Sequence, residues 1–486
     1  MENGLCTIEI RLGVGVGVRV QGNCGVGVCV KETLLLLLSL AAPIFVPLAA
    51  QSRTLPPDST VLAIVRQRVD EKHNAGIVVG LLHRGERPRV VAYGLGAADR
   101  RLDGNSVFEI GSITKTFTAT VLADMVRRGE VLLDEPVAKY LPASAHIPKR
   151  NGKEITFVDL STQSSGLPRM PTNFAPKNAA NPYADYDTDR LFAFLGSYEL
   201  PRDIGSQFEY SNLGIGLLGV TLAARDGAGY EAMMRRRVLD PLGMRDTRIQ
   251  LTPEMREHLA PGHNPAGTPV ANWDLDALAG AGAIRSTMND MLTYLAANLD
   301  STSHPFGPAM HDAHRPLRPA GVMRIGLNWL VLSGAGPDIT WHNGGTGGYS
   351  TYIGFDELNG NGVVVLSNTS TSVDDIGMHL LDAQRPLMVF PKPRQEMPLT
   401  PAALERFVGD YALAPTFHLV ITRDGATLWA QPTGQAKVQL FAEKENEFFL
   451  KVVDAQLSFT ADSSGAVTGL VLHQNGAHTP GRKILQ

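Results

Sequence analysis

The sequence contains almost no cysteine. Its 486 residues include three, Cys6, Cys24 and Cys29, and all of them lie within the first thirty positions. If the mature chain begins near Gln51, as argued below, it has no cysteine at all. Disulfide bonds, cysteine nucleophiles and cysteine-ligated zinc are then excluded together.

The sequence also lacks an excess of positive charge. Lys and Arg number 44, Asp and Glu number 48, and the net charge is −4, with no block of like charges. Nucleic-acid binding depends on a basic field or patch on the protein. We therefore expect no nucleic-acid partner.

A long unbroken hydrophobic run is missing as well. The apolar stretch from 34 to 50 is interrupted by Pro43 and Pro47, whereas a membrane-spanning helix needs about 20 apolar residues. Lys31 before this stretch and the small residues Ala49 and Ala50 at its end are typical of a secretory signal peptide. A single membrane anchor is the alternative, which the prolines disfavour. We expect export to the periplasm or the medium by a bacterial-type signal, and no stable membrane span after cleavage.

The length exceeds that of one ordinary domain. We expect residues 1–50 to comprise an appendage and the signal peptide, and residues 51–390 to form the main domain. Residues 391–401 are rich in proline and are predicted to be a linker. Residues 402–486 alternate strand-like segments with turn residues, which predicts a small all-β domain, a partly closed barrel or a sandwich. A structural or docking role is expected for it.

The main domain combines helical and strand patterns. An amphipathic helix is predicted from Asp58 to Val69, followed by strands from Ile77 to Leu82 and from Val90 to Tyr93. Four further strands are predicted between 327 and 367, the last of them fully apolar, and residues 301–320 are predicted to be loop. This order favours an α+β fold, with an antiparallel sheet flanked by helices.

The first candidate for chemistry is Ser112-x-x-Lys115 at the start of a predicted helix. Residues three apart share a helical face, so the Lys115 amine can reach the Ser112 hydroxyl and take its proton. A helix N-terminus also offers backbone N–H groups to an oxyanion. The pattern alone is weak, because Ser is a common N-cap and the spacing arises by chance.

The second candidate is Tyr210-x-Asn212, just before a predicted helix from Leu213. A phenol beside a lysine can become a phenolate or share a proton with that lysine, and then accept the serine proton. Asn212 can present its amide to a substrate carbonyl. A core tyrosine in a loop is the alternative for Tyr210.

The third candidate is His342-x-Gly344-Gly345, at the end of a predicted strand. Glycines allow a substrate backbone to approach a strand closely. A free N–H here could complete an oxyanion hole with the N–H of Ser112. A surface histidine and a tight hairpin are the alternatives.

Together, and in this order, the three motifs resemble those of the penicillin-recognising serine hydrolases. The branch that they resemble contains the class C β-lactamases, the D-alanyl-D-alanine carboxypeptidases and the class VIII esterases. Four further stretches also look familial: Phe108 to Gly111, Ser165 to Pro168, Pro241 to Met244, and Arg285 to Thr287. The resemblance implies a β-lactamase/transpeptidase-like α+β fold with a helical subdomain.

The resemblance also implies roles for these residues. Ser112 would be the acylated nucleophile, Lys115 and Tyr210 the general base system, and Asn212, His342, Gly344 and Gly345 substrate-binding residues. The N–H groups of Ser112 and Gly345 would form the oxyanion hole. His342 stands where class C β-lactamases usually carry lysine, which removes a permanent positive charge.

The sequence therefore predicts a serine hydrolase without metal or organic cofactor. Its expected substrate is a small molecule or peptide with a β-lactam or D-alanyl amide bond. A carboxylesterase acting on short acyl esters is one alternative. A non-catalytic peptidoglycan-binding protein is another, which the intact Ser112, Lys115 and Tyr210 disfavour.

Overall fold

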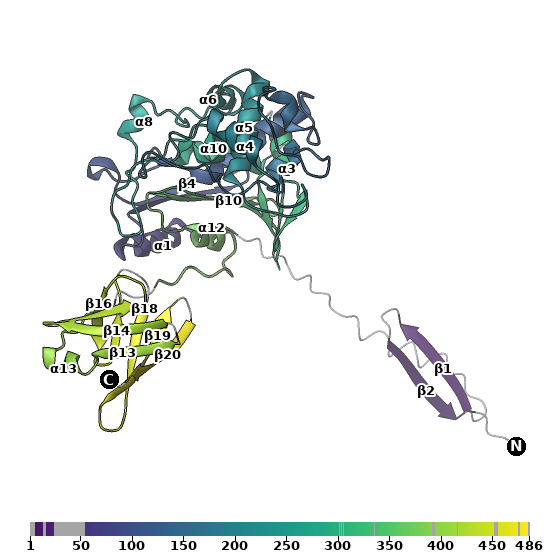
Figure 1. Cartoon of the computed structure of the whole chain (residues 1–486). Coiled ribbons are helices and arrows are strands. Elements are labelled where there is room, and N and C mark those ends of the chain that lie inside the picture. The colour runs from purple at the N-terminus through teal and green to yellow at the C-terminus, as the bar shows by residue number, and fades with distance from the viewer. Residues whose placement is uncertain are drawn as a thin grey trace. The chain divides into compact units, whose positions relative to one another are not determined.

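The computed structural model describes residues 5–12, 16–23, 54–300, 302, 304, 306–334, 336–390, 394–415, 417–451, 455–474 and 477–484. The chain divides into two compact units, Met1–Leu387 and Met388–Gln486 (Figure 1). The predicted signal peptide lies outside the described residues. Within the described ranges, no helix has the length and apolar character to cross a bilayer.

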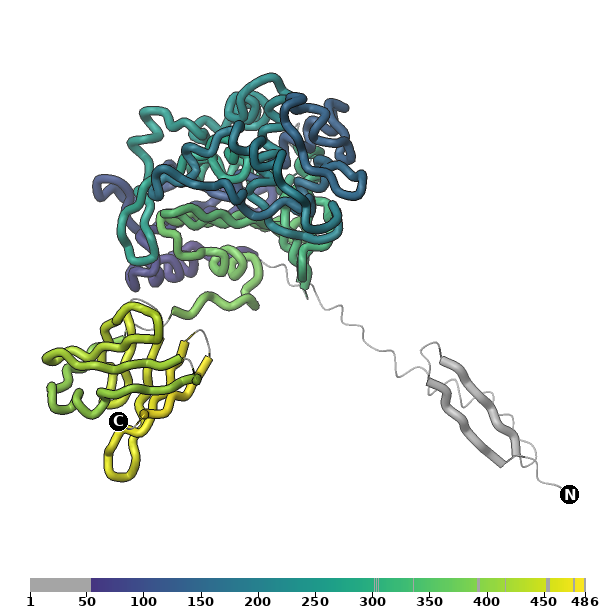
Figure 2. The backbone as a smooth tube through the Cα atoms, viewed as in Figure 1, coloured from purple at the N-terminus to yellow at the C-terminus, as the bar shows by residue number. Residues whose placement is uncertain are grey.

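The first unit is built on an eight-stranded sheet in which every pair of neighbours is antiparallel, as predicted. The strand order is β4-β3-β12-β11-β10-β9-β8-β7. The bounds are β3 Gly76–His83, β4 Arg89–Gly94, β7 Arg318–Ala320, β8 Met323–Ile325, β9 Leu330–Leu332, β10 Ile339–Gly345, β11 Ser350–Asp356 and β12 Asn361–Ser367. The early strand β3 pairs with the late strand β12, so the purple and green parts of the chain run side by side in Figure 2.

Both faces of this sheet are covered. Val363 and Val365 of β12 pack with α1 (Asp58–Asp70) and α12 (Asp374–Leu381), whereas Val364 and Leu366 face the core on the opposite side. Figure 1 shows α1 and α12 beneath the sheet and α4, α5, α6 and α10 above it. Burial on two faces explains why β12 is continuously apolar, as predicted. Each fully buried Val or Leu side chain contributes about 1.5–3 kcal/mol to the free energy of folding, relative to the same side chain in water.

The helical layer carries most of the remaining chain. Its helices are α2 Thr114–Arg127, α3 Phe157–Ser161, α4 Thr188–Ser197, α5 Asn212–Asp226, α6 Tyr230–Met234, α7 Asp240–Leu242, α8 Pro253–Glu257, α9 Ala279–Gly282, α10 Met288–Leu299 and α11 Gly307–His314. Short turns of helix occur at η1 Ala97–Asp99, η2 Gly111–Ile113, η3 Val137–Tyr140 and η4 Arg235–Leu239. Two short strands, β5 (Val107–Glu109) and β6 (Arg285–Thr287), pair before α2 and α10.

The loop predicted over 301–320 is wrong over 307–314 and 318–320, where α11 and β7 lie. Pro308 occupies the first turn of α11, where a missing N–H costs little. Ala309, Met310 and Ala313 bury one face of the helix in the core. The Pro and His content suggested a loop, but this tertiary packing stabilises a helix.

The second unit is a closed eight-stranded antiparallel barrel, preceded by α13 (Pro401–Glu405). Its strands are β13 Gly409–Ala414, β14 Phe417–Asp424, β15 Thr427–Pro432, β16 Val438–Lys444, β17 Glu447–Phe449, β18 Ala455–Ala461, β19 Val467–Gln474 and β20 Ala477–Ile484. Phe407, Tyr411, Phe448 and Phe459 form its aromatic core. The predicted all-β domain is confirmed, and pairing of β13 with β20 closes the barrel.

Candidate active site

The turn that carries Ser112 is held against the end of β10. Gly111 has φ of +51°, and a Cβ built on it would lie 2.6 Å from the backbone nitrogen of Gly345. Only glycine fits both the backbone angle and this close approach. The Thr351 hydroxyl of β11 donates to the Ile110 carbonyl at 2.9 Å and fixes the same turn. Ser112 is thereby placed where η2 leads into α2, with its side chain partly exposed.

Lys115 is fully buried, and its amine has three close neighbours. Nζ lies 2.8 Å from Ser112 Oγ, 2.9 Å from Asn212 Oδ1 and 2.7 Å from the Ala281 carbonyl. Burial, and secondarily the charge of Arg169, holds the pKa of Lys115 well below its usual value. The two carbonyl-type oxygens can only accept hydrogen bonds, so they take both N–H bonds of a neutral amine. In that neutral form, the nitrogen lone pair would face the Ser112 hydroxyl.

Tyr210 stands immediately before α5. The Ser211 hydroxyl caps that helix by accepting from the Gly214 N–H at 2.8 Å, which places Asn212 in the first turn. Ser112 acts to lower the pKa of Tyr210, and the Lys115 nitrogen lies 4.8 Å from the ring centre. Burial raises the pKa of Tyr210 to about 12. The phenol therefore keeps its proton at neutral pH, and these electrostatics favour Lys115 over a Tyr210 phenolate as the resting base.

His342 lies in β10 on the other side of Tyr210, with ring centres 6.2 Å apart. Its side chain is 2% exposed. Burial first, and then the nearby Lys115, lowers the pKa of His342 to about 3. Nδ1 lies 2.6 Å from the Asn343 carbonyl, so Nδ1 carries the ring proton. The imidazole is neutral at physiological pH.

The two glycines at the end of β10 complete the assembly. A Cβ on Gly344 would lie 2.0 Å from the Ile110 carbonyl oxygen, so this strand end contacts the turn before Ser112 directly. Gly345 is exposed and contacts Gly111. The structure thus brings all seven predicted site residues together from three distant segments of the chain.

A small cavity of about 30 Å³ opens beside Ser112, enough for one or two water molecules. Most of the side chains that line this cavity were not predicted from the sequence. Tyr183 comes from an irregular loop and Trp273 from another, with Leu275 and Leu278 beside them. The backbone N–H of Trp273 donates to the buried Glu109 carboxylate at 2.8 Å. None of these residues belongs to a motif that can be recognised in the sequence. Ala281 also lines the cavity, and its backbone carbonyl accepts a hydrogen bond from Lys115.

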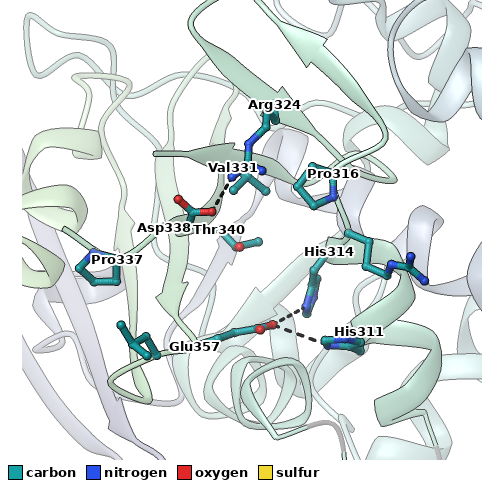
Figure 3. A pocket seen from close by; sticks show the side chains of 11 residues that line it. His311, His314, Pro316, Arg324, Val331, Pro337, Asp338, Thr340 and Glu357 are labelled. Carbon is teal, nitrogen blue, oxygen red and sulfur yellow. Dashed lines mark hydrogen bonds and ion pairs between the residues drawn. The ribbon is translucent and has the colours of Figure 1, made fainter. Parts of the chain in front are cut away.

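A second, wider cavity of about 610 Å³ lies between α11 and strands β8 to β10 (Figure 3). Its polar groups pair with one another: His314 Nδ1 lies 3.3 Å from Glu357 Oε1, and Arg324 forms an ion pair with Asp338. The residues that line it include no serine, cysteine or lysine. Across the described part of the chain, no cluster of three or more His, Cys, Asp or Glu residues could hold a metal ion. The chemistry therefore concentrates at Ser112.

Comparison with family models gives two matches. The model described as Beta-lactamase matches residues 61–385, and a domain of unknown function, DUF3471, matches residues 393–481. The first match includes every predicted site residue. The second falls on the barrel.

Individual relatives agree with the first match. The chain is 29% identical to the D-alanyl-D-alanine-carboxypeptidase/endopeptidase AmpH of Escherichia coli K12, over 59% of this chain and 79% of that protein. It is 28% identical to a β-lactamase of Pseudomonas fluorescens, over 64% and 92%. Among solved structures, a class C β-lactamase from Rhodobacter sphaeroides superposes with a TM-score of 0.56 at 26% identity, covering 64% of this chain and 94% of that one.

Proposed function

Because the chain belongs to the Beta-lactamase family of serine hydrolases, we propose that it forms an acyl-enzyme on Ser112 and cleaves the amide bond of a β-lactam or a D-alanyl peptide. One observation carries this proposal. A buried lysine with a lowered pKa lies 2.8 Å from the serine hydroxyl, and two oxygens that can only accept hydrogen bonds lie 2.9 Å and 2.7 Å from the same nitrogen.

Acylation follows from this arrangement. The Lys115 lone pair accepts the Ser112 proton as Oγ attacks the substrate carbonyl carbon. The N–H groups of Ser112 and Gly345 stabilise the oxyanion of the tetrahedral intermediate. Tyr210, a neutral phenol, donates its proton to the departing nitrogen and regains one from Lys115. The carbon–nitrogen bond breaks, and Ser112 carries the acyl group as an ester.

In deacylation, water is the nucleophile and the Ser112 oxygen is the leaving group. A water molecule attacks the ester carbonyl and gives its proton to Lys115, and the Ser112 oxygen leaves with a proton returned by the same base system. Asn212 remains hydrogen-bonded to Lys115 and offers its Nδ2 group to a substrate amide oxygen. No metal or organic cofactor takes part in this proposal.

The substrate class is proposed from the relatives. One relative is named as a carboxypeptidase and endopeptidase for D-alanyl-D-alanine and another as a β-lactamase. A β-lactam and a D-alanyl peptide both present an amide carbonyl with a carboxylate nearby. A third relative is the penicillin-binding protein 4* of Bacillus subtilis, which is 24% identical over 78% of this chain and 88% of that one.

Export is part of the same proposal, since a peptidoglycan substrate lies outside the cytoplasmic membrane. The Lys31 to Ala50 segment supports it by its signal-peptide pattern. N-terminal sequencing of the secreted protein is expected to begin near Gln51. A mature N-terminus well upstream of Lys31 would contradict the export signal.

The test of the nucleophile is intact-protein mass spectrometry after incubation with benzylpenicillin, together with assays of nitrocefin and a D-Ala-D-Ala peptide. The wild-type chain should gain the mass of one penicilloyl group. Ser112→Ala should lose this adduct, and turnover should fall by several orders of magnitude because the nucleophile is gone. Ser206→Ala, at an exposed serine outside the site, serves as the matched control and should behave as wild type.

Other results would favour the alternatives. Ser112-dependent cleavage of a p-nitrophenyl ester without any penicilloyl adduct or peptide cleavage would indicate a carboxylesterase. Absence of any acylation in the wild-type chain would indicate a binding protein. Unchanged turnover in Ser112→Ala would refute the assigned nucleophile.

A further inference from the structure

One arginine at the site has no partner of opposite charge. Arg169 directly follows the Ser165 to Pro168 stretch, and its carbonyl accepts the Asn212 N–H at 3.0 Å and the Leu213 N–H at 3.3 Å. These bonds fix its backbone beside the start of α5. The residue itself is exposed. Within the described chain, its guanidinium forms neither an ion pair nor a hydrogen bond.

The guanidinium is directed toward the catalytic groups. Its central carbon lies 5.1 Å from the centre of the Tyr210 ring, within the range of a cation–π contact. Its charge also acts to lower the pKa of Lys115, Tyr210 and Tyr183. Tyr183 lines the cavity beside Ser112. Arg169 therefore projects a positive field into the site from its solvent-facing edge.

The other candidate cations in the site are not available to a substrate anion. His342 is neutral, because burial lowers its pKa to about 3. Lys115 is fully buried, and its nitrogen already contacts Ser112, Asn212 and the Ala281 carbonyl. The position at which class C β-lactamases usually carry a lysine thus supplies no charge in this chain. Arg169 supplies one from a different segment.

We infer that Arg169 is a specificity-determining residue that binds the carboxylate on the leaving-group side of an anionic substrate, in place of a cation at position 342. The inference rests on the proposed function for the substrate class, because D-alanyl peptides and β-lactams both carry this carboxylate. A guanidinium can hold a carboxylate through two parallel N–H bonds. The adjacent Tyr210 ring keeps the guanidinium stacked and pre-oriented.

The test uses two aryl acetates that differ only in charge, 3-acetoxybenzoate and neutral 3-acetoxybenzamide. For Arg169→Gln, kcat/KM for the benzoate should fall about tenfold, the loss expected for one charge-assisted hydrogen-bonded contact. The value for the benzamide should stay within about twofold of wild type. For Arg169→Lys, kcat/KM for the benzoate should lie between the wild-type value and the Arg169→Gln value, since lysine keeps the charge but not the paired donors. Arg245→Gln, at another exposed arginine whose side chain has no hydrogen bond or ion pair with the described residues, is the control and should leave the ratio of the two esters unchanged.

The salt dependence gives a second measure. The wild-type preference for the benzoate should weaken between low salt and about 1 M salt, where the screening length falls to about 3 Å. In Arg169→Gln the ratio should no longer depend on salt. Equal losses for both esters would overturn the inference, because Arg169 would then act through Lys115 and Tyr210 or through folding. No loss for the benzoate would overturn it as well.

A parallel experiment separates this inference from the proposed function. Acylation of Ser112 by benzylpenicillin and by its methyl ester is followed by intact mass. If neither compound acylates the wild-type chain while the aryl ester ratio still depends on Arg169, the proposed β-lactam and peptide substrates fail and the carboxylate site stands. If benzylpenicillin acylates the wild type and Arg169→Gln equally, the function stands and the carboxylate site fails.

Discussion

At the scale of single residues, the site depends on the protonation state of two neighbours. Burial lowers the pKa of Lys115 well below its usual value and raises that of Tyr210 to about 12. The two shifts favour the state in which the phenol holds its proton and the amine is neutral. Lys115 can then accept the Ser112 proton, and Tyr210 can donate one to a leaving group. The two groups have separate tasks because burial disfavours the charged form of each.

This division predicts the pH dependence of acylation. The acid limb of kcat/KM for a neutral ester should have its midpoint well below pH 10.5, because only neutral Lys115 can accept the proton. Tyr210 should not end the plateau below about pH 11, since its pKa is raised to about 12. Lys115→Arg should lower kcat/KM by several orders of magnitude, because a guanidinium stays charged throughout. A pH–rate profile from about pH 5 to about pH 11.5 checks this, and a midpoint near the ordinary lysine value of 10.5 would contradict it.

At the scale of elements, a polar turn holds Tyr210 in place. The segment after α3 carries Gln163, which is buried and has φ of +57°. Its backbone carbonyl accepts the Glu209 N–H at 2.7 Å, and its side-chain Oε1 accepts the Ser211 N–H at 2.7 Å. Nε2 donates to Asn328 Oδ1 at 3.2 Å. Gln163 thus holds the backbone on both sides of Tyr210.

We predict that Gln163 acts as a positioning residue for Tyr210. Gln163→Leu keeps the shape but removes the acceptor of a buried N–H, which should cost about 1–3 kcal/mol of stability. It should also lower kcat by about tenfold with a smaller change in KM, since a misplaced group weakens the transition state more than substrate binding. Gln163→Glu, which keeps an acceptor oxygen, should restore part of kcat. Thermal unfolding and steady-state kinetics measure both effects, and a loss of stability with unchanged kcat would make the role purely structural.

At the scale of the whole molecule, each of the two units has its own hydrophobic core. In the first unit, two histidines are buried in their neutral form. Burial lowers the pKa of His342 to about 3 and also lowers that of His314, which the Glu357 carboxylate partly opposes. In the unfolded chain both titrate near pH 6.5. The unfolded state therefore binds more protons below that pH, and stability falls as the pH decreases.

The expected result is a free energy of unfolding that declines from about pH 6.5 down to about pH 3 in the first unit. His342 can contribute a slope of up to about 1.4 kcal/mol per pH unit in this window, and His314 adds to the slope in the same direction below about pH 6.5. His342→Gln should remove its part of the slope, even if the variant is less stable at pH 7. Denaturant titrations at several pH values measure the slope. An identical slope in His342→Gln and wild type would show that His342 does not titrate on unfolding.

Local patterns predicted a large part of this protein. Periodicity predicted α1, β3 and β4 within one residue at each end, and the start of α5 within one residue. Gly129, a glycine shortly after the last turn of α2, has φ of +69°. The C-terminal segment was correctly predicted to be all-β. These features follow from side-chain spacing and turn residues that lie close together in the chain.

Other features depend on partners far away in the sequence. The barrel closes through β13 and β20, which lie about 70 residues apart and show no local signal for each other. The helix α11 forms in a Pro- and His-rich stretch because the core accepts its apolar face. Trp273 and Tyr183 reach the cavity beside Ser112 from separate loops. No short-range pattern encodes such contacts.

The sequence by itself determined which chemical groups are present and in which order, from Ser112 and Lys115 through Tyr210 and Asn212 to His342 and the two glycines. Only the tertiary structure decided their charge states. Burial lowers the pKa of Lys115 well below its usual value and the pKa of His342 to about 3, and Arg169 remains the exposed cation beside Tyr210. A pKa depends on the solvent and the charges that surround a group in space, and the order of residues in a chain does not specify that environment until the chain has folded.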